Sequence, residues 1–173
     1  ETGVGCVWRF WNLEVGWVMI TGGALIVMSV LLFVINVWMT SAICKEYSLQ
    51  KLFITSSAFW LLFTVSLGLL LAINLGLTSP LFSISHLEVL KLHAHMGIAG
   101  WFLQLIAGVS TKLVPMFLLG KSNKDHLMRN AFVLQNLGLI LFLTDGFFFT
   151  ITWRVFIYAT LVLAGIIFWL LYL

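Results

Sequence analysis

Long uncharged stretches constrain this chain more than any other feature of its sequence. No Asp, Glu, Lys or Arg occurs in five runs: Val15–Cys44, Leu52–Leu87, Leu92–Thr111, Asn130–Thr144 and Val155–Leu173. About 20 mostly apolar residues are enough for a helix to cross the hydrocarbon core of a bilayer. Backbone amides in lipid must find their hydrogen-bond partners inside the protein, so we expect these runs to form helices rather than open strands.

The runs predict an all-α fold, a polytopic transmembrane helix bundle that forms a single transmembrane domain over residues 1–173. The expected membrane spans are five: Val15–Thr40, Leu52–Leu77, Leu92–Leu119, Asn130–Phe148 and Val155–Leu173. The fourth span has the least regular end, because Asp145-Gly146 is typical of a turn. The chain begins without Met and ends inside an apolar run, so we expect it to be part of a longer chain or of a larger helix bundle.

Composition excludes the main soluble classes. Charged residues make up 9% of the 173 residues and hydrophobic residues 62%, with a mean hydropathy of +1.12. Soluble domains carry about 25% charged residues, so this chain has too few to cover a globule in water. The net charge of +3 does not indicate a nucleic-acid partner, because six of the nine Lys and Arg lie in or beside two short connections. The expected partners are the lipid bilayer and other membrane subunits or a second copy of the chain.

The basic residues also predict an orientation. Six of them flank the first–second and third–fourth connections: Lys45, Lys51, Lys112, Lys121, Lys124 and Arg129. The other side carries three: Arg9, Lys91 and Arg154. Since cytoplasmic connections are enriched in Lys and Arg, we expect these two connections to be cytoplasmic and the N-terminus to lie outside. The expected location is a bacterial inner membrane.

Histidines mark the start of the third span. His93 and His95 open it, and ionisable groups inside membrane spans are functional candidates by default. Residues two apart lie about 200° apart around a helix, so one metal ion cannot bind both side chains. The His93 face carries small and polar residues: Gly97, Gly100, Gln104, Gly108 and Thr111. Glycines beside an imidazole leave room for a flat macrocycle, which favours His93 over His95 as the axial ligand of a heme.

A stripe of glycines has a second interpretation. Small residues spaced along a membrane helix also allow two helices to pack closely, with no cofactor involved. The stripe on the His93 face is therefore compatible with a ligand site and with plain helix packing.

Two stretches of this segment support a resemblance to a known family. They are Leu92-His93-Ala94-His95, followed by the glycines at 97, 100 and 108, and Lys112-Leu113-Val114-Pro115-Met116. This pattern resembles the second transmembrane helix of the catalytic subunit of the heme-copper oxidase superfamily, nearest its nitric-oxide-reductase-like branch. The resemblance covers residues 91–116 and implies that His93 ligates a low-spin heme b near the outer face. His95 stays open as an alternative ligand.

Other residues are candidates for binding or supporting that heme. His86 is a second alternative ligand, although Ser79-Pro80 favours a loop or interfacial helix there, outside the spans. Lys91 and Arg154 are candidate partners for heme propionates, with ordinary interface charges or an Asp145–Arg154 ion pair as the alternative. Gln104 is the embedded amide expected to support the ligand by hydrogen bonding.

The chain also departs from the family. The superfamily's reaction centre needs three His on a second metal and a proximal His for the high-spin heme, whereas this chain has four His and no adjacent pair. No copper site is therefore complete in this chain, and whether it is an enzyme stays open. The resemblance implies a heme-binding, respiratory-chain-like membrane protein in electron transfer or in nitric oxide or oxygen handling. The alternative is a non-catalytic membrane scaffold or accessory subunit without its own cofactor.

Overall fold

The computed structural model describes residues 13–43, 48–76, 85–118, 124–149 and 153–173. Its helices are α2 (Leu13–Ile43), α3 (Leu49–Gly76), α4 (His86–His95), η1 (Met96–Phe102), α5 (Leu103–Leu118), α6 (Asp125–Phe148) and α7 (Arg154–Tyr172). The segments α4, η1 and α5 form one continuous helix from His86 to Leu118. Within the described residues, five helices are thus long and apolar enough to cross a membrane, which confirms the predicted all-α bundle.

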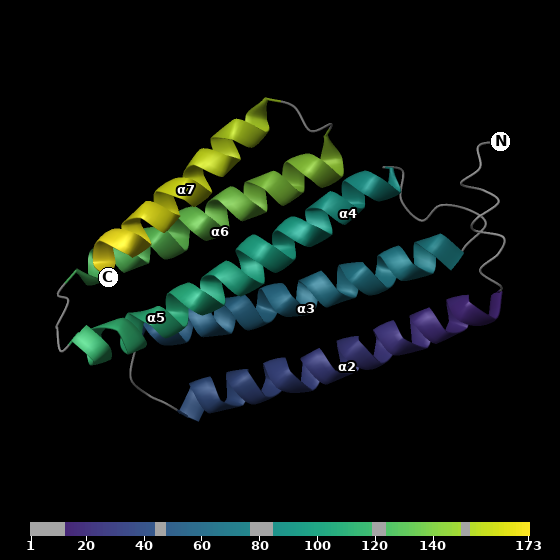
Figure 1. The fold of residues 1–173 in the computed structure, drawn as a ribbon, viewed down its shortest axis with the longest axis horizontal. Helices are drawn as coiled ribbons and strands as arrows, with labels where there is room; N and C mark the ends of the chain where they lie inside the picture. Colours follow the sequence, from purple (N-terminus) through teal and green to yellow (C-terminus); the bar gives the residue numbers. More distant parts are fainter. Residues whose placement is uncertain (1–12, 44–47, 77–84, 119–123, 150–152) are drawn as a thin grey trace.

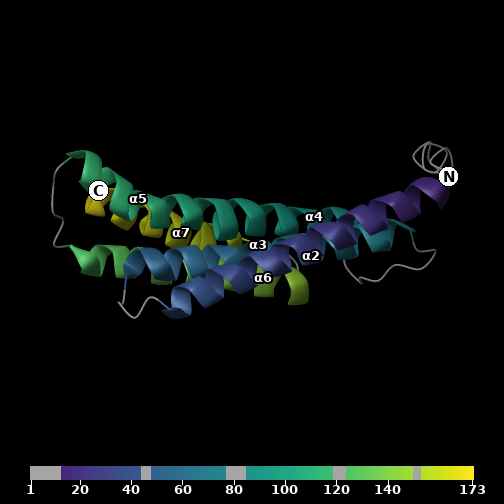
Figure 2. The same cartoon turned by 90° about the horizontal axis from the view of Figure 1, so that it is seen from below.

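The helices run back and forth and lie side by side (Figures 1 and 2). At the edges of the bundle, α2 packs mainly on α3 and α7 mainly on α6, while the α4–α5 helix lies between α3 and α6. We call one end of the bundle the basic end; there the helices end or begin at Ile43, Leu49, Leu118, Asp125 and Tyr172. We call the other the histidine end; there they end or begin at Gly76, His86, Phe148 and Arg154.

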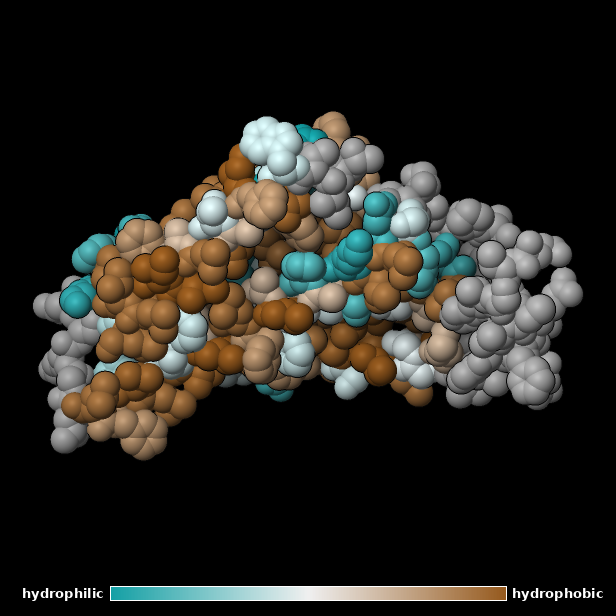
Figure 3. Space-filling model, turned by 45° about the horizontal axis from the view of Figure 1, so that its top comes forward, coloured by the Kyte–Doolittle hydropathy of each residue, from teal (hydrophilic) through white to brown (hydrophobic). Residues whose placement is uncertain are grey.

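Apolar side chains cover much of the outside of the bundle (Figure 3). Exposed examples are Leu32 on α2, Phe102 on η1 and Phe156 on α7, which are 65%, 54% and 74% exposed. Surfaces of this kind are unfavourable in water and match the hydrocarbon of a bilayer. The partner of this surface is therefore lipid, and the protein is an integral membrane protein.

The third helix begins at His86 rather than at Leu92. Ser85 caps it: this residue has extended backbone angles of φ −61° and ψ 143°, and its Oγ accepts a hydrogen bond of 3.3 Å from the Glu88 N–H. Such a cap satisfies one of the free amides of the first turn. The expectation that His86 lies in a loop or interfacial helix outside the third span is therefore wrong, because one helix runs from His86 to Leu118. Ser79-Pro80 lies outside the described residues.

The fourth helix begins earlier than predicted but ends at the predicted residue, Phe148. It begins at Asp125 rather than Asn130, so His126 lies in its first turn, and it passes through Asp145 and Gly146 without a turn. A carboxylate is tolerated there because Arg154 pairs with it. Gly146 is tolerated because the side chain of Leu92 occupies the space beside it, where a larger residue would clash.

A π-helical segment interrupts the third helix directly after His95. Residues Met96–Phe102 form η1, in which the backbone hydrogen bonds reach from i to i+5. Sequence periodicity did not predict it, because the faces were assigned with the α-helical repeat throughout. The wider turn changes the angle, measured around the helix axis, between the two histidines and the residues that follow them.

Candidate functional site

His93 lies at the contact between α4 and α3. The ring is half-buried and rests against Gly68 of α3, where an added Cβ would be 3.0 Å from the His93 Cε1 and 3.8 Å from its Nε2. Its Nδ1 is buried and has no hydrogen-bond partner within the described part of the chain. The glycine at position 68 therefore lets the α3 backbone approach the imidazole directly.

The glycine stripe beside His93 faces neighbouring helices. An added Cβ would lie 3.4 Å from Thr64 Cγ2 at Gly97 and 2.8 Å from Trp60 Cγ at Gly100. At Gly108 it would lie 2.8 Å from Cβ of another α3 residue, Phe53. Side chains of α3 thus fill the space that the sequence suggested for a macrocycle. On this face a porphyrin does not fit unless α3 moves away, and the stripe acts in helix packing.

Gln104 belongs to a polar cluster inside the bundle. This side chain is fully buried, and its Nε2 donates a hydrogen bond of 3.1 Å to Oδ1 of Asn136 on α6. The same oxygen accepts hydrogen bonds from Nε1 of Trp60 at 2.9 Å and from Oγ of Ser56 at 3.3 Å. Asn136 therefore joins α3, α5 and α6 at one atom. The sequence analysis did not single out Asn136, because its partners are far away along the chain.

His95 has a different environment, on an exposed part of α4 beside α6. Its Nδ1 lies 2.7 Å from the backbone oxygen of Lys91, and its ring stacks at 45° on Phe142 with a centroid distance of 4.8 Å. A carbonyl oxygen only accepts hydrogen bonds, so Nδ1 carries the proton and donates it. The neutral ring then presents its lone pair at Nε2, as a metal-binding imidazole does.

His86 is held in the opposite tautomer. Its Nδ1 lies 3.3 Å from Nδ2 of Asn74, so the amide donates and Nδ1 accepts. The proton of the neutral ring is then on Nε2, and neither nitrogen offers a free lone pair to a metal. This arrangement disfavours His86 as a ligand.

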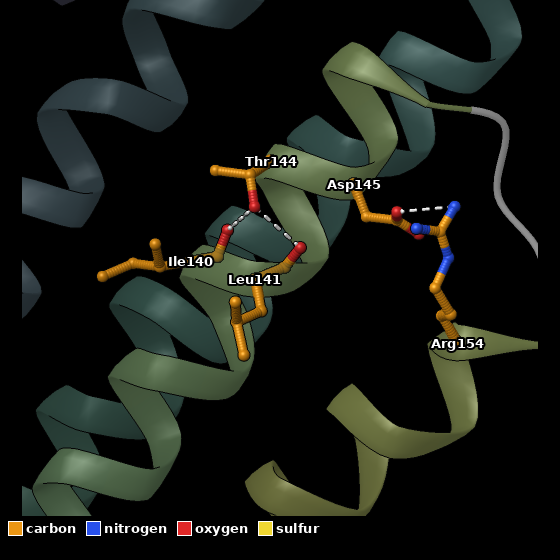
Figure 4. A network of polar contacts seen from close by, with 5 residues as sticks. All are labelled: Ile140, Leu141, Thr144, Asp145 and Arg154. Carbon is orange, nitrogen blue, oxygen red and sulfur yellow. Dashed lines mark hydrogen bonds and ion pairs between the residues drawn. The ribbon is translucent and has the colours of Figure 1, made fainter.

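Two cations were expected near the heme, and one of them already has an acidic partner. Figure 4 shows the ion pair between Arg154 Nη2 and Asp145 Oδ1, at 3.2 Å. The carboxylate is 4% exposed and the guanidinium side chain 38%. The guanidinium carbon also lies 5.3 Å from the ring centroid of Phe149. The alternative of an Asp145–Arg154 ion pair is therefore confirmed, whereas Lys91 is an exposed cation one helical turn before His95.

The part of the chain that the structure describes brings no three His, Cys, Asp or Glu side chains close enough to hold a bare metal ion. A heme needs less from the protein, because the porphyrin supplies four ligands and the protein supplies only the axial ones. A single imidazole with an available Nε2, as in His95, meets that requirement.

Comparison with known proteins identifies no relative of this chain, because no protein-family model, curated protein or solved structure matches it.

Proposed function

We propose that this chain is a heme-binding integral membrane protein in which Nε2 of His95 is an axial ligand of the iron. The observation that carries the proposal is the hydrogen bond of 2.7 Å from Nδ1–H of His95 to the carbonyl of Lys91. Metal-binding histidines commonly donate their other ring N–H to a carbonyl, which sets the tautomer and the ring orientation.

The surroundings of His95 support the same assignment. Phe142 offers an apolar ring beside it, and Lys91 places an exposed ammonium on the same helix face, four residues earlier. That ammonium suits a propionate, which needs a cationic partner near the membrane surface. His95 replaces His93 as the preferred ligand because α3 covers the His93 face.

A heme on the exposed His95 face needs a cover on its far side. We infer that another membrane subunit or a second copy of the chain supplies that cover together with any second axial ligand. A bound heme supplies one-electron transfer or the binding of a diatomic gas such as nitric oxide or oxygen. Within this chain, His95 binds the iron, Lys91 pairs with a propionate, and Phe142 excludes water from one side.

The proposal is tested by heme content in matched histidine variants. The full chain is produced with a heme supply, purified in detergent and assayed as the pyridine hemochrome. We expect heme in the unaltered protein and in His93→Ala, and its loss in His95→Ala with unchanged helix content by circular dichroism. Heme kept by His95→Ala and lost from His93→Ala would refute the assignment and return the ligand to His93.

A second function is supported by the glycine stripe. Because Gly100 and Gly108 pack directly on α3, this bundle forms a close contact without any cofactor. That observation favours a membrane scaffold or accessory subunit that keeps the family's helix packing and binds no heme. A colourless but folded protein that co-purifies with one membrane partner would establish this function in place of heme binding.

The orientation belongs to the same proposal. We infer a bacterial inner membrane with the basic end in the cytoplasm and the histidine end outside, because most Lys and Arg flank the basic end. The bound heme would then lie near the outer surface, where the resembled family keeps it.

A further inference from the structure

A polar cavity opens at the basic end of the bundle, opposite to His86, His93 and His95. Its volume is about 350 Å³, and four helices contribute to its walls. The polar residues that line it are Ser48, Gln50, Thr111, Lys112, Asp125, Arg129 and Tyr172. They come from the start of α3, the end of α5, the start of α6 and the end of α7. Residues distant in sequence thus meet where the apolar spans end.

The cavity has more positive than negative charge. Lys112 and Arg129 are exposed, and neither forms an ion pair within the described part of the chain. One carboxylate, that of Asp125, lines the same space. The first turn of α3 also borders it, through Leu49 and Gln50. The first amides of a helix lack intrahelical partners and attract an anion.

The walls are held in place by apolar packing beneath them. Phe53, Ala107 and Met128 are fully buried in one cluster below the cavity, and Tyr172 packs against that cluster. A hydrogen bond of 2.7 Å from Nε1 of Trp169 to Oγ of Ser110 ties α7 to α5. The cavity is therefore present before any ligand arrives, and binding requires little reorganisation.

We propose that this cavity binds the headgroup of an amine-bearing phospholipid. The phosphate is held by Lys112 and Arg129, because ammonium and guanidinium donors pair with phosphate oxygens. The headgroup amine is held by Asp125. The cavity lies at the end of five membrane-crossing helices, which is the level of the headgroups, and basic pockets between such helices bind lipid phosphates.

A soluble phosphoamine offers the same charged groups but no acyl chains. The lipid is favoured because the cavity lies where membrane-crossing helices end, at the level of the headgroups, where acyl chains anchor a lipid and not a soluble phosphoamine. The proposal does not depend on heme binding, since the cavity is built from the other ends of the helices.

Native mass spectrometry of the full chain in detergent tests the proposal. Protein is titrated with dioleoylphosphatidylethanolamine, with dioleoylphosphatidylglycerol and with free phosphoethanolamine. We expect the ethanolamine lipid to bind at least about tenfold tighter than either of the others, which corresponds to 1.4 kcal/mol. Equal or tighter binding of the glycerol lipid refutes the role of Asp125, and equal binding of free phosphoethanolamine refutes the lipid as the source.

Substitutions test the contribution of each charged residue to lipid binding. The double variant Lys112→Gln/Arg129→Gln should lose about tenfold or more in lipid affinity. The control Lys124→Gln removes an exposed cation at the same end that does not line the cavity, and it should leave lipid affinity unchanged. Asp125→Asn should remove the preference for the ethanolamine lipid while phosphate binding continues. Unchanged affinity in the double variant, with helix content preserved, would refute the site.

Discussion

Replacing Asn136 by Leu should destabilise the bundle by about 2 kcal/mol. Oδ1 of Asn136 accepts three hydrogen bonds from other helices, at 2.9, 3.1 and 3.3 Å. Hydrogen bonds between membrane helices contribute about 0.6 kcal/mol each, so the loss of three amounts to about 2 kcal/mol. Leucine has a similar volume, so the packing of α6 should change little. The effect on Gln104 would be largest, because its buried Oε1 has no hydrogen-bond partner among the described residues and its Nε2 would lose the acceptor on Asn136.

The measurement is the free energy of unfolding in mixed micelles, titrated with sodium dodecyl sulfate and followed by circular dichroism. Thr144→Val is the matched control, because Oγ1 of Thr144 bonds only to carbonyls of its own helix, at 3.0 Å to Ile140 and to Leu141 (Figure 4). That control should change the free energy by no more than about 0.5 kcal/mol.

A double-mutant cycle then isolates one hydrogen bond of the cluster. Asn136→Leu and Gln104→Leu together should destabilise the protein less than the sum of the two single variants, by about 0.6 kcal/mol or more. Strictly additive effects, or an Asn136→Leu variant as stable as the Thr144→Val control, would refute the conclusion that this cluster holds three helices together.

Three further predictions follow from the same structure. Gly100→Val should destabilise the bundle by about 1–3 kcal/mol in the same titration, because the added atoms overlap side chains of α3 and α6; a neutral effect would mean that α3 does not approach there. Arg154→Gln should lower the free energy of unfolding by about 2 kcal/mol, because it leaves the buried carboxylate of Asp145 unpaired. Adding Asp145→Asn should restore part of that free energy, and a double variant no more stable than Arg154→Gln would contradict the ion pair. Cysteine placed at Lys91 should react with an impermeant maleimide from outside intact cells and cysteine at Lys124 only after permeabilisation, and the reverse pattern would invert the proposed orientation.

The class of protein and the number of helices were predictable from local features. Hydropathy is a property of each stretch of chain, and a stretch such as Leu52–Leu77 that is long, apolar and uncharged has few structural options in any context. The helix ends were less predictable. His86 was expected in a loop or interfacial helix outside the third span, whereas that helix begins at His86. Asp145-Gly146 was marked as typical of a turn, whereas the helix continues through it and Asp145 pairs with Arg154 of another helix.

The candidate site was predictable as a set of residues but not as an arrangement. The sequence marked His93, His95 and the glycine at 100 as the unusual residues of the third helix, and all of them make specific contacts. Their roles could not be assigned, because α3, which fills the His93 face beside Gly100, is a separate element whose position the sequence of the third helix does not reveal.

Sequence alone established an all-helical membrane protein with five spans, an asymmetric distribution of basic residues and a pair of histidines at the start of the third span. Those conclusions need only the free energy of transferring each segment into lipid, which depends little on the rest of the chain. Tertiary structure decided that α3 fills the His93 face, that His95 keeps Nε2 available, and that Lys112 and Arg129 line one cavity. Such properties depend on which helix lies against which face, because a side chain's room and hydrogen bonds are set by neighbours that the local sequence does not contain.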